Sequence, residues 1–240
     1  MSIFPTVVHI SQIAAAVVSR QPLPAMQYEN IEEGYQAQRK LTARINGGSQ
    51  SNLKAGVTAE AVQRQLGLQA PLIGSLYHSG RLQSGCELTL AEGQELECEI
   101  GVVVDGAGSP VGLVPVVEVV YLAFSRREDF SIANALAVNL GADRYICGDV
   151  APWDPGLAEV AINVWKDDVQ VATVINEYSF GSPDCGASWI VAEATKRNLW
   201  QPGAENCLLI LGTCGAPLKG EKGNYRFAFG ELGEVCLRVR

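Results

Sequence analysis

The clearest pattern of hydrophobic and polar positions lies in residues 93–105, where apolar and acidic residues alternate. Such a period of two predicts a β-strand, because successive side chains on a strand point to opposite faces. One predicted face carries Leu96, Cys98, Ile100, Val102 and Val104, and the other carries Glu95, Glu97, Glu99 and Gly101. Carboxylates on one face can hold a hard cation together, but a solvated acidic face gives the same pattern. The pattern alone leaves both interpretations open.

A second run, residues 111–124, is apolar at nearly every position and has one carboxylate, Glu118, in its middle. A strand that is apolar on both faces is usually buried, and a buried ionised carboxylate is costly without a cation or hydrogen-bond donors. A divalent ion shared with Glu97 and Glu99 would satisfy all three carboxylates, and an all-oxygen ligand set favours Mg2+ or Mn2+ over zinc. The alternative is an edge-strand glutamate that reaches solvent or pairs with an arginine.

Helical periodicity dominates the N-terminal part of the chain. The predicted helices cover residues 10–18, the segment between Asn30 and Gly47, and residues 59–66, the last capped by Thr58 and ended by Gly67. Between them, residues 53–57 are predicted to form a short strand. Lys54 then lies on a strand among apolar neighbours, where it is either a surface lysine with a buried stem or a catalytic group.

Strand patterns dominate from Leu88 onward, with a Gly-rich turn at 105–110. The predicted strands cover 95–105, 114–123, 160–164, 169–173, 225–229 and 235–239, and short helices are predicted over 131–140 and over 185–197, the latter capped by Asp184. We therefore expect an α+β fold with a mainly helical N-terminal region, 1–67, packed on a β-rich catalytic core, 68–240, the two forming one structural unit.

Composition and charge narrow the function classes. The net charge of -8 and the absence of a basic run argue against nucleic acid and anionic membranes as partners. The first ten residues lack the basic start of a signal peptide, and no apolar stretch is long enough to span a membrane. The 7 cysteines are scattered and form no CxxC pair, which indicates reduced thiols and a cytoplasmic protein. Neither a P-loop nor a GxGxxG motif is present.

Several short motifs occur in a fixed order along the chain. They are the lysine block Lys54-Ala-Gly-Val-Thr-Ala-Glu-Ala-Val-Gln-Arg-Gln-Leu-Gly67, the strand Glu97-Cys-Glu99-Ile, the strand Val116-Val-Glu118-Val-Val, the segment from Asn139 to Gly148, and the turn Leu211-Gly-Thr213-Cys-Gly-Ala-Pro217. In this order the chain resembles the fumarylacetoacetate hydrolase superfamily, and within it the 2-oxopent-4-enoate hydratase and 4-oxalocrotonate decarboxylase branch. The resemblance covers nearly the whole chain.

The resemblance implies a mixed β-roll that binds Mg2+ or Mn2+ through Glu97, Glu99 and Glu118. The substrate would be a small 2-oxo acid that reacts through an enolate, with Lys54 as general acid or base. The implied substrate-binding residues are Leu72, Ile73, Asn139 and Thr213. Hydration is the reaction we favour from the sequence, with decarboxylation as the nearest alternative. A homo-oligomer, or a complex with a related hydratase or decarboxylase, is also expected.

The chain departs from the family pattern at several positions. Leu72 stands where the family has an aspartate with an acid or base role in hydration, and Gly141 or Ala142 stands in place of a serine. Tyr77 and His78 are candidates to replace the lost aspartate. The segment between Glu99 and Glu118 is short, which predicts a trimmed lid over the metal. These departures also leave open a non-catalytic family member that serves as a binding or assembly subunit.

Overall fold

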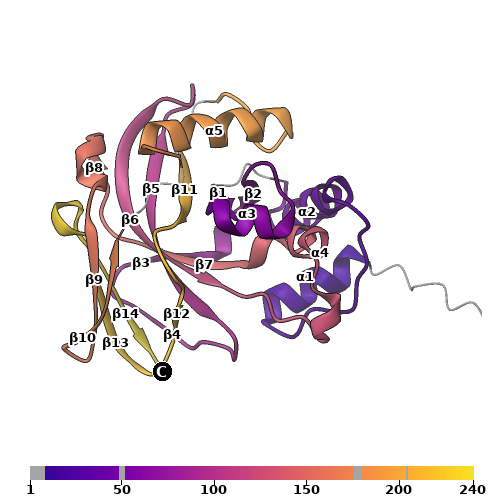
Figure 1. Ribbon diagram of the computed structural model, residues 1–240, viewed down its shortest axis with the longest axis horizontal. Helices are drawn as coiled ribbons and strands as arrows, with labels where there is room; N and C mark the ends of the chain where they lie inside the picture. The colour runs from indigo at the N-terminus through magenta and orange to yellow at the C-terminus, as the bar shows by residue number, and fades with distance from the viewer. Residues whose placement is uncertain (1–8, 49–51, 176–179, 204) are drawn as a thin grey trace, which may run out of the picture.

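Two β-sheets form the centre of the fold, and helices cover one side and one end of them (Figure 1). The computed structural model describes residues 9–48, 52–175, 180–203 and 205–240. Its α-helices are α1 (Ile10–Ser19), α2 (Ile31–Asn46), α3 (Glu60–Leu66), α4 (Ile132–Ala137) and α5 (Pro183–Lys196). The observed architecture confirms the predicted α+β fold class.

The larger sheet has nine strands, in the order β2-β1-β11-β5-β6-β7-β3, with β12 paired to β5 and β8 to β6. These strands are β1 (Leu53–Gly56), β2 (Leu72–Ser75), β3 (Arg81–Gln83), β5 (Glu95–Val104), β6 (Pro110–Val120), β7 (Ala142–Cys147), β8 (Ala151–Pro152), β11 (Cys207–Thr213) and β12 (Leu218–Lys219). The sheet curls strongly, so strands that are far apart in its order can face one another (Figure 1). The long hairpin β5–β6 forms its middle.

The smaller sheet has five strands in the order β10-β9-β13-β14-β4. They are β4 (Cys86–Leu88), β9 (Ala161–Lys166), β10 (Val169–Ile175), β13 (Gly223–Ala228) and β14 (Glu234–Val239). Both hairpins predicted from the alternating pattern, β9–β10 and β13–β14, are present. Phe227, Val235 and Leu237 point into the core between the sheets and are buried.

Local capping explains where the helices begin and end. The Asn30 side chain accepts a hydrogen bond from Glu33 N, and Gly47 ends α2 in the left-handed conformation, as predicted. The predicted caps of the other two helices are wrong. Ala59 precedes α3, because Thr58 lies one residue too early and is buried. Ser182 caps α5, and Asp184 instead places its charge in the first turn.

The N-terminal region is not separate from the large sheet. Helices α1, α2 and α4 share an apolar cluster that includes Ile13, Leu23, Leu41 and Val138. Strand β1, however, pairs with β11 on one side and with β2 on the other. The domain boundary expected at residue 67 therefore falls between two strands that pair with each other.

Strand β2 is an edge strand whose outer backbone groups are bonded by side chains. Ile73 N donates to the Tyr35 hydroxyl at 3.1 Å, and the Gln38 amide donates to Ile73 O at 3.0 Å. Ser75 N donates to Asn139 Oδ1 at 2.8 Å, and the Asn139 amide donates in return to Ser75 O. These bonds satisfy an edge that would otherwise expose free backbone groups, and they hold β2 against β1.

The turn between β5 and β6 lies at the opposite end of the hairpin from Glu97 and Glu118. Asp105 accepts hydrogen bonds from Ala107 N and Ser109 N there, and a side chain at Gly108 would meet Val191 of α5. This turn therefore packs near α5, and the prediction that the short segment forms a trimmed lid over the metal is wrong.

Within the described ranges, no helix is long and apolar enough to cross a membrane. Residues 1–8, on which the signal-peptide expectation depends, lie outside the described part of the chain.

The Asn30 cap gives a direct test of the local structure. Replacing Asn30 by Ala removes the side-chain acceptor for Glu33 N, so we expect the free energy of unfolding to fall by about 1 kcal/mol. Asn30→Ser keeps an acceptor at this position and should retain most of the stability. Urea unfolding of the three proteins measures the difference, and equal losses in both variants would contradict the capping role.

Candidate functional site

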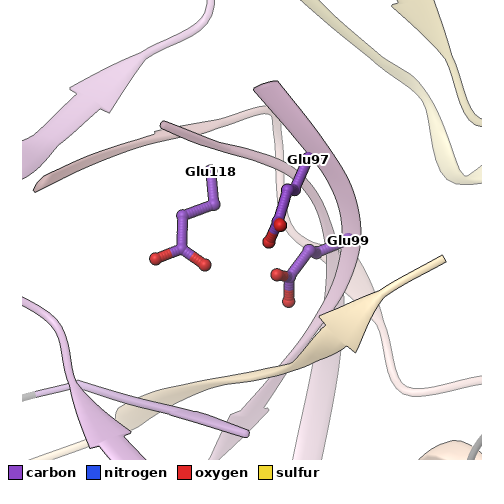
Figure 2. Close-up of side chains that lie close together, drawn as sticks. All are labelled: Glu97, Glu99 and Glu118. Atoms are coloured by element: carbon purple, nitrogen blue, oxygen red, sulfur yellow. The ribbon is translucent and has the colours of Figure 1, made fainter. Parts of the chain in front are cut away.

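The carboxylates of Glu97, Glu99 and Glu118 converge on one point of the large sheet. Glu97 and Glu99 project from the same face of β5, and Glu118 lies on β6 directly opposite Glu97 in the antiparallel register. One oxygen from each carboxylate lies within 4.8 Å of the others. Figure 2 shows the three side chains pointing toward a common space. Alternation along β5 and the register of the hairpin together produce this cluster.

These carboxylates do not form a solvated acidic face. Glu99 and Glu118 are 0% exposed, and Glu97 is only partly exposed. Glu95, on the same side of β5, is exposed to solvent. Like charges directly opposite one another on a sheet destabilise it, so the buried cluster needs compensating positive charge.

Lys54 supplies part of that charge. Its ammonium donates to both oxygens of Glu118, at 2.6 and 2.7 Å, and the residue is only 3% exposed. Lys54 lies on β1 beside Ile210 of β11, and β11 separates β1 from β5 in the sheet. The long side chain therefore spans the curled sheet to reach β6. The interpretation of Lys54 as a surface lysine is wrong.

Burial and charge shift the pKa values of this cluster. Burial by itself lowers the pKa of Lys54, but the charges of Glu118, Glu97 and Glu99 outweigh it and the pKa is raised. Burial, opposed by Lys54 and assisted by Glu118, raises the pKa of Glu97 to about 7. Burial, followed by repulsion from Glu118 and Glu97, raises the pKa of Glu99 well above its ordinary value. Lys54 is therefore a protonated acid at neutral pH.

A β-bulge completes the surroundings of Glu99. The register between β11 and β5 shifts between Ile210 and Thr213, and Gly212 there has a φ of 102°. Gly212 N consequently points at the carboxylate and donates to Glu99 Oε2 at 2.8 Å. Glu99 Oε1 is buried and has no hydrogen-bond partner among the described residues. An orphaned buried oxygen within an all-carboxylate set fits a hard divalent cation.

A cavity of about 500 Å3 opens beside the cluster. Lys54, Glu97, Glu99, Thr58 and Thr213 supply its polar groups. The rest of the wall is mainly apolar and includes Val62, Leu66, Val120, Leu122, Phe130 and Ile132. Val62 and Phe130 are 42% and 50% exposed, so apolar surface faces solvent on the cavity wall. A small acid with an extended carbon chain matches this combination of a few polar groups and a mainly apolar wall.

The structure separates the predicted substrate-binding residues into two groups. Thr213 lines the cavity, and its hydroxyl donates to Gly215 O. Leu72 and Ile73 are buried in β2 and are not among the cavity-lining residues, and Asn139 bonds the backbone of Ser75 instead. Contact of these three residues with substrate stays a prediction.

The proposed replacements for the family aspartate do not reach the cavity. Tyr77 is buried and His78 is exposed, and neither lines it. Gly212 was not predicted as a donor to Glu99, although it lies within the turn 211–217 that carried part of the resemblance. Phe130 was not predicted either, because a single aromatic residue in a loop has no periodic signal.

Several solved structures have a fold similar to that of this chain. No family model matches the sequence, and no curated protein sequence does. The structure of 4-oxalocrotonate decarboxylase from Pseudomonas putida G7, complexed with magnesium and adipate, matches with a TM-score of 0.80 at 19% identity and covers 96% of this chain and 95% of that chain. Fumarylpyruvate hydrolase from Pseudomonas aeruginosa, in complex with Mn2+ and pyruvate, matches with a TM-score of 0.54 at 16% identity, covering 78% and 88%.

A fumarylacetoacetate hydrolase family protein from Yersinia pestis CO92 also matches, with a TM-score of 0.54 at 10% identity, covering 78% of this chain and 92% of that chain. The chain therefore has the fold of the fumarylacetoacetate hydrolase superfamily, as the sequence motifs predicted. The similarity to the decarboxylase extends over nearly the whole of both chains.

The raised pKa of Glu97 predicts how the stability of the metal-free protein depends on pH. A carboxyl group whose pKa is about 7 when folded and 4.5 ordinarily stabilises the fold fully below pH 4.5, and this contribution is lost as pH rises to about 7. In EDTA, Glu97 should therefore contribute a fall of about 3 kcal/mol in the free energy of unfolding over this range, and Glu99, whose pKa is also raised, should add to the fall. The free energy of unfolding of Glu97→Gln should fall less steeply with pH than that of wild type.

Glu95→Gln is the matched control, because Glu95 lies on the same side of the strand but is exposed. Urea unfolding at several pH values measures the slopes. A slope in Glu97→Gln as steep as in wild type would show that Glu97 does not titrate as described.

Proposed function

We propose that the protein is a metal-dependent enzyme that removes a carboxyl group from a small 2-oxo acid. The observation that carries this proposal is the convergence of Glu97, Glu99, Glu118 and Lys54 beside a cavity whose other lining side chains are uncharged. The fold shared with 4-oxalocrotonate decarboxylase supports it.

Glu97, Glu99 and Glu118 would hold the metal ion, and Mg2+ or Mn2+ suits their oxygen ligands. When bound, such an ion supplies Lewis-acid chemistry that draws electrons toward the oxygens of a 2-oxo acid. The structures of the decarboxylase and of fumarylpyruvate hydrolase are complexed with magnesium and with Mn2+, which supports this choice.

Lys54 would act as the general acid. Its pKa is raised, so it carries a proton at neutral pH, and it lines the cavity beside the carboxylates. From there the ammonium can donate to an oxygen on C2 of the substrate and neutralise negative charge that develops on it. A role as general base fits less well, because the surrounding carboxylates favour the protonated amine.

The apolar part of the cavity wall favours loss of a carboxylate from the substrate. A second carboxylate of the substrate would lie near side chains such as Leu122 and Phe130, where its charge is poorly solvated. When its bond to carbon breaks, CO2 leaves and the bonding electron pair moves through the conjugated double bond to the oxygen on C2. A proton from Lys54 then gives the neutral enol. The negative charge thus moves away from the apolar part of the wall and toward Lys54.

Hydration, which we favoured from the sequence, becomes the second candidate. It needs a base that activates water at the far end of the substrate. The cavity-lining residues of the described chain offer only the hydroxyls of Thr58 and Thr213 outside the charged cluster, and Leu72 stands at the family aspartate position. The expected homo-oligomer and the complex with a related enzyme stay predictions.

Turnover assays separate the reactions. With Mg2+ or Mn2+, 4-oxalocrotonate should release CO2, whereas 2-hydroxypenta-2,4-dienoate should lose its dienol absorbance only if the protein is a hydratase. Lys54→Met should lower kcat for CO2 release by about 10²-fold, because it removes the proton donor. Consumption of the dienoate without CO2 release from 4-oxalocrotonate would overturn the proposed reaction. Metal binding without turnover of either compound would favour the non-catalytic subunit.

Metal binding has a separate test in thermal stability. At a free metal concentration about a hundred times its Kd, wild type should gain roughly 2.7 kcal/mol over the protein in EDTA. Glu118→Gln should lose most of this gain, because an amide is a poorer ligand for a hard cation. Glu95→Gln keeps all three ligands and should retain the gain. Equal gains in wild type and Glu118→Gln would exclude Glu118 as a ligand.

A further inference from the structure

Lys54 lies directly opposite a glycine of the neighbouring strand. Gly74 of β2 is the register partner of Lys54 on β1. A Cβ atom added at Gly74 would lie 2.9 Å from Lys54 Cγ and 3.3 Å from Lys54 Cδ, and 3.5 Å from Asn139 Oδ1. The first of these distances is shorter than two carbon atoms can tolerate without movement. The aliphatic stem of Lys54 therefore occupies the space that any other residue at position 74 would fill.

The backbone on both sides of Gly74 is held in place. On one side, the Tyr35 hydroxyl and the Gln38 amide bond the N–H and C=O of Ile73. On the other side, the Asn139 side chain bonds the N–H and C=O of Ser75. All four backbone groups next to Gly74 on the outer edge thus have side-chain partners. This surface, formed by Gly74, Ser75 and Asn139, is called the lysine seat below.

The backbone conformation of the turn that contains Asn139 is energetically costly. Asn139, Leu140 and Gly141 have φ values of 62°, 54° and 73°, and for Leu140 this left-handed conformation is unfavourable. The turn brings the Asn139 amide onto both backbone groups of Ser75, and it places Leu140 in the cavity wall. A strained turn that is kept beside the site calls for a gain elsewhere.

We propose that Gly74 and Asn139 are positioning residues, which fix the path of the Lys54 side chain so that its ammonium reaches the carboxylate cluster. In this role they act through Lys54. A lysine stem has several rotatable bonds, and ordering it requires contacts along its length. Gly74 lies against the Cγ and Cδ of this stem and leaves it room to pass, and Asn139 holds the neighbouring backbone of Ser75 in place. The catalytic side of this inference rests on the proposed function.

The positions of the other predicted residues fit this account. Ile73 was expected to bind substrate, but its backbone is one of the anchors of β2. Asn139 was expected to do the same, and both ends of its side-chain amide are already bonded to Ser75. A displacement of a proton donor by about 1 Å can lower a rate by about 10²-fold. Residues that only position the Lys54 side chain can therefore strongly affect turnover.

Kinetics of Gly74→Ala test the positioning role. We expect kcat to fall by roughly 10- to 100-fold while KM changes little, because the donor shifts but the cavity wall is kept. Asn139→Gly should act in the same direction, since glycine accepts the left-handed φ but lacks the amide. Gly112→Ala is the matched control, because it also crowds a buried strand, against Val150 and Ala151, at the end of β6 away from Glu118. It should leave kcat unchanged.

Equal losses of kcat in Gly74→Ala and Gly112→Ala, or a change confined to KM, would overturn the positioning role. Gly112→Ala thus separates a general loss of packing from displacement of Lys54.

A second measurement does not depend on turnover. In EDTA, Gly74→Ala should lower the Tm of a Glu118→Gln protein clearly more when Lys54 is present than when it is replaced by alanine, because an alanine side chain has no Cγ or Cδ to meet the new methyl group. The four proteins carry either Lys54 or Lys54→Ala, each with and without Gly74→Ala. Glu118→Gln is included in all of them so that removal of Lys54 leaves no unpaired Glu118 charge. Equal shifts would disprove the contact between position 74 and Lys54. Wild type without turnover would refute the proposed function, while this cycle still tests the seat.

Discussion

Buried charge at one point of the large sheet is the constraint on which the rest of the structure depends. Three carboxylates and one ammonium are gathered where water has little access. The Lys54–Glu118 pair and the Gly212 N–H compensate part of the negative charge, and burial, which raises the pKa of Glu99, favours its uncharged form. Such buried ionic groups are weak evidence for stability, because desolvation offsets their attraction. A buried cluster of this kind is therefore a candidate functional site rather than a source of stability.

The architecture brings these groups together by curling one sheet. The β5–β6 register sets Glu97 opposite Glu118, and the bulge in β11 turns an N–H toward Glu99. Strand β1 carries Lys54 from the far side of β11, and the bonded edge of β2 supports it. The helices contribute most through α2, whose Tyr35 and Gln38 hold that edge. Strands thus carry the charged groups, while α3 and the 130–132 segment form part of the apolar cavity wall.

The division of the cavity connects its shape to its chemistry. The charged groups of the cavity wall belong to Lys54, Glu97 and Glu99, and the rest of the wall includes apolar side chains such as Val62 and Phe130. A reaction that moves negative charge toward Lys54 gains from this asymmetry, because fixed charges and dipoles there need no reorganisation. Addition of water beside the apolar part of the wall would gain nothing comparable.

The sequence by itself determined that Glu97 and Glu99 share one face of a strand and that Glu118 lies within a second, apolar strand, because alternation along 95–104 and one glutamate in an apolar run are local signals. It also placed Lys54 on a strand and bounded α2 by its caps. Only the tertiary structure decided that Lys54 meets Glu118, 64 residues away, that Leu72 is core, and that Asn139 serves Ser75. Those outcomes depend on strand order, on a bulge and on side chains that cross between elements, and none of these has a period that the chain could display.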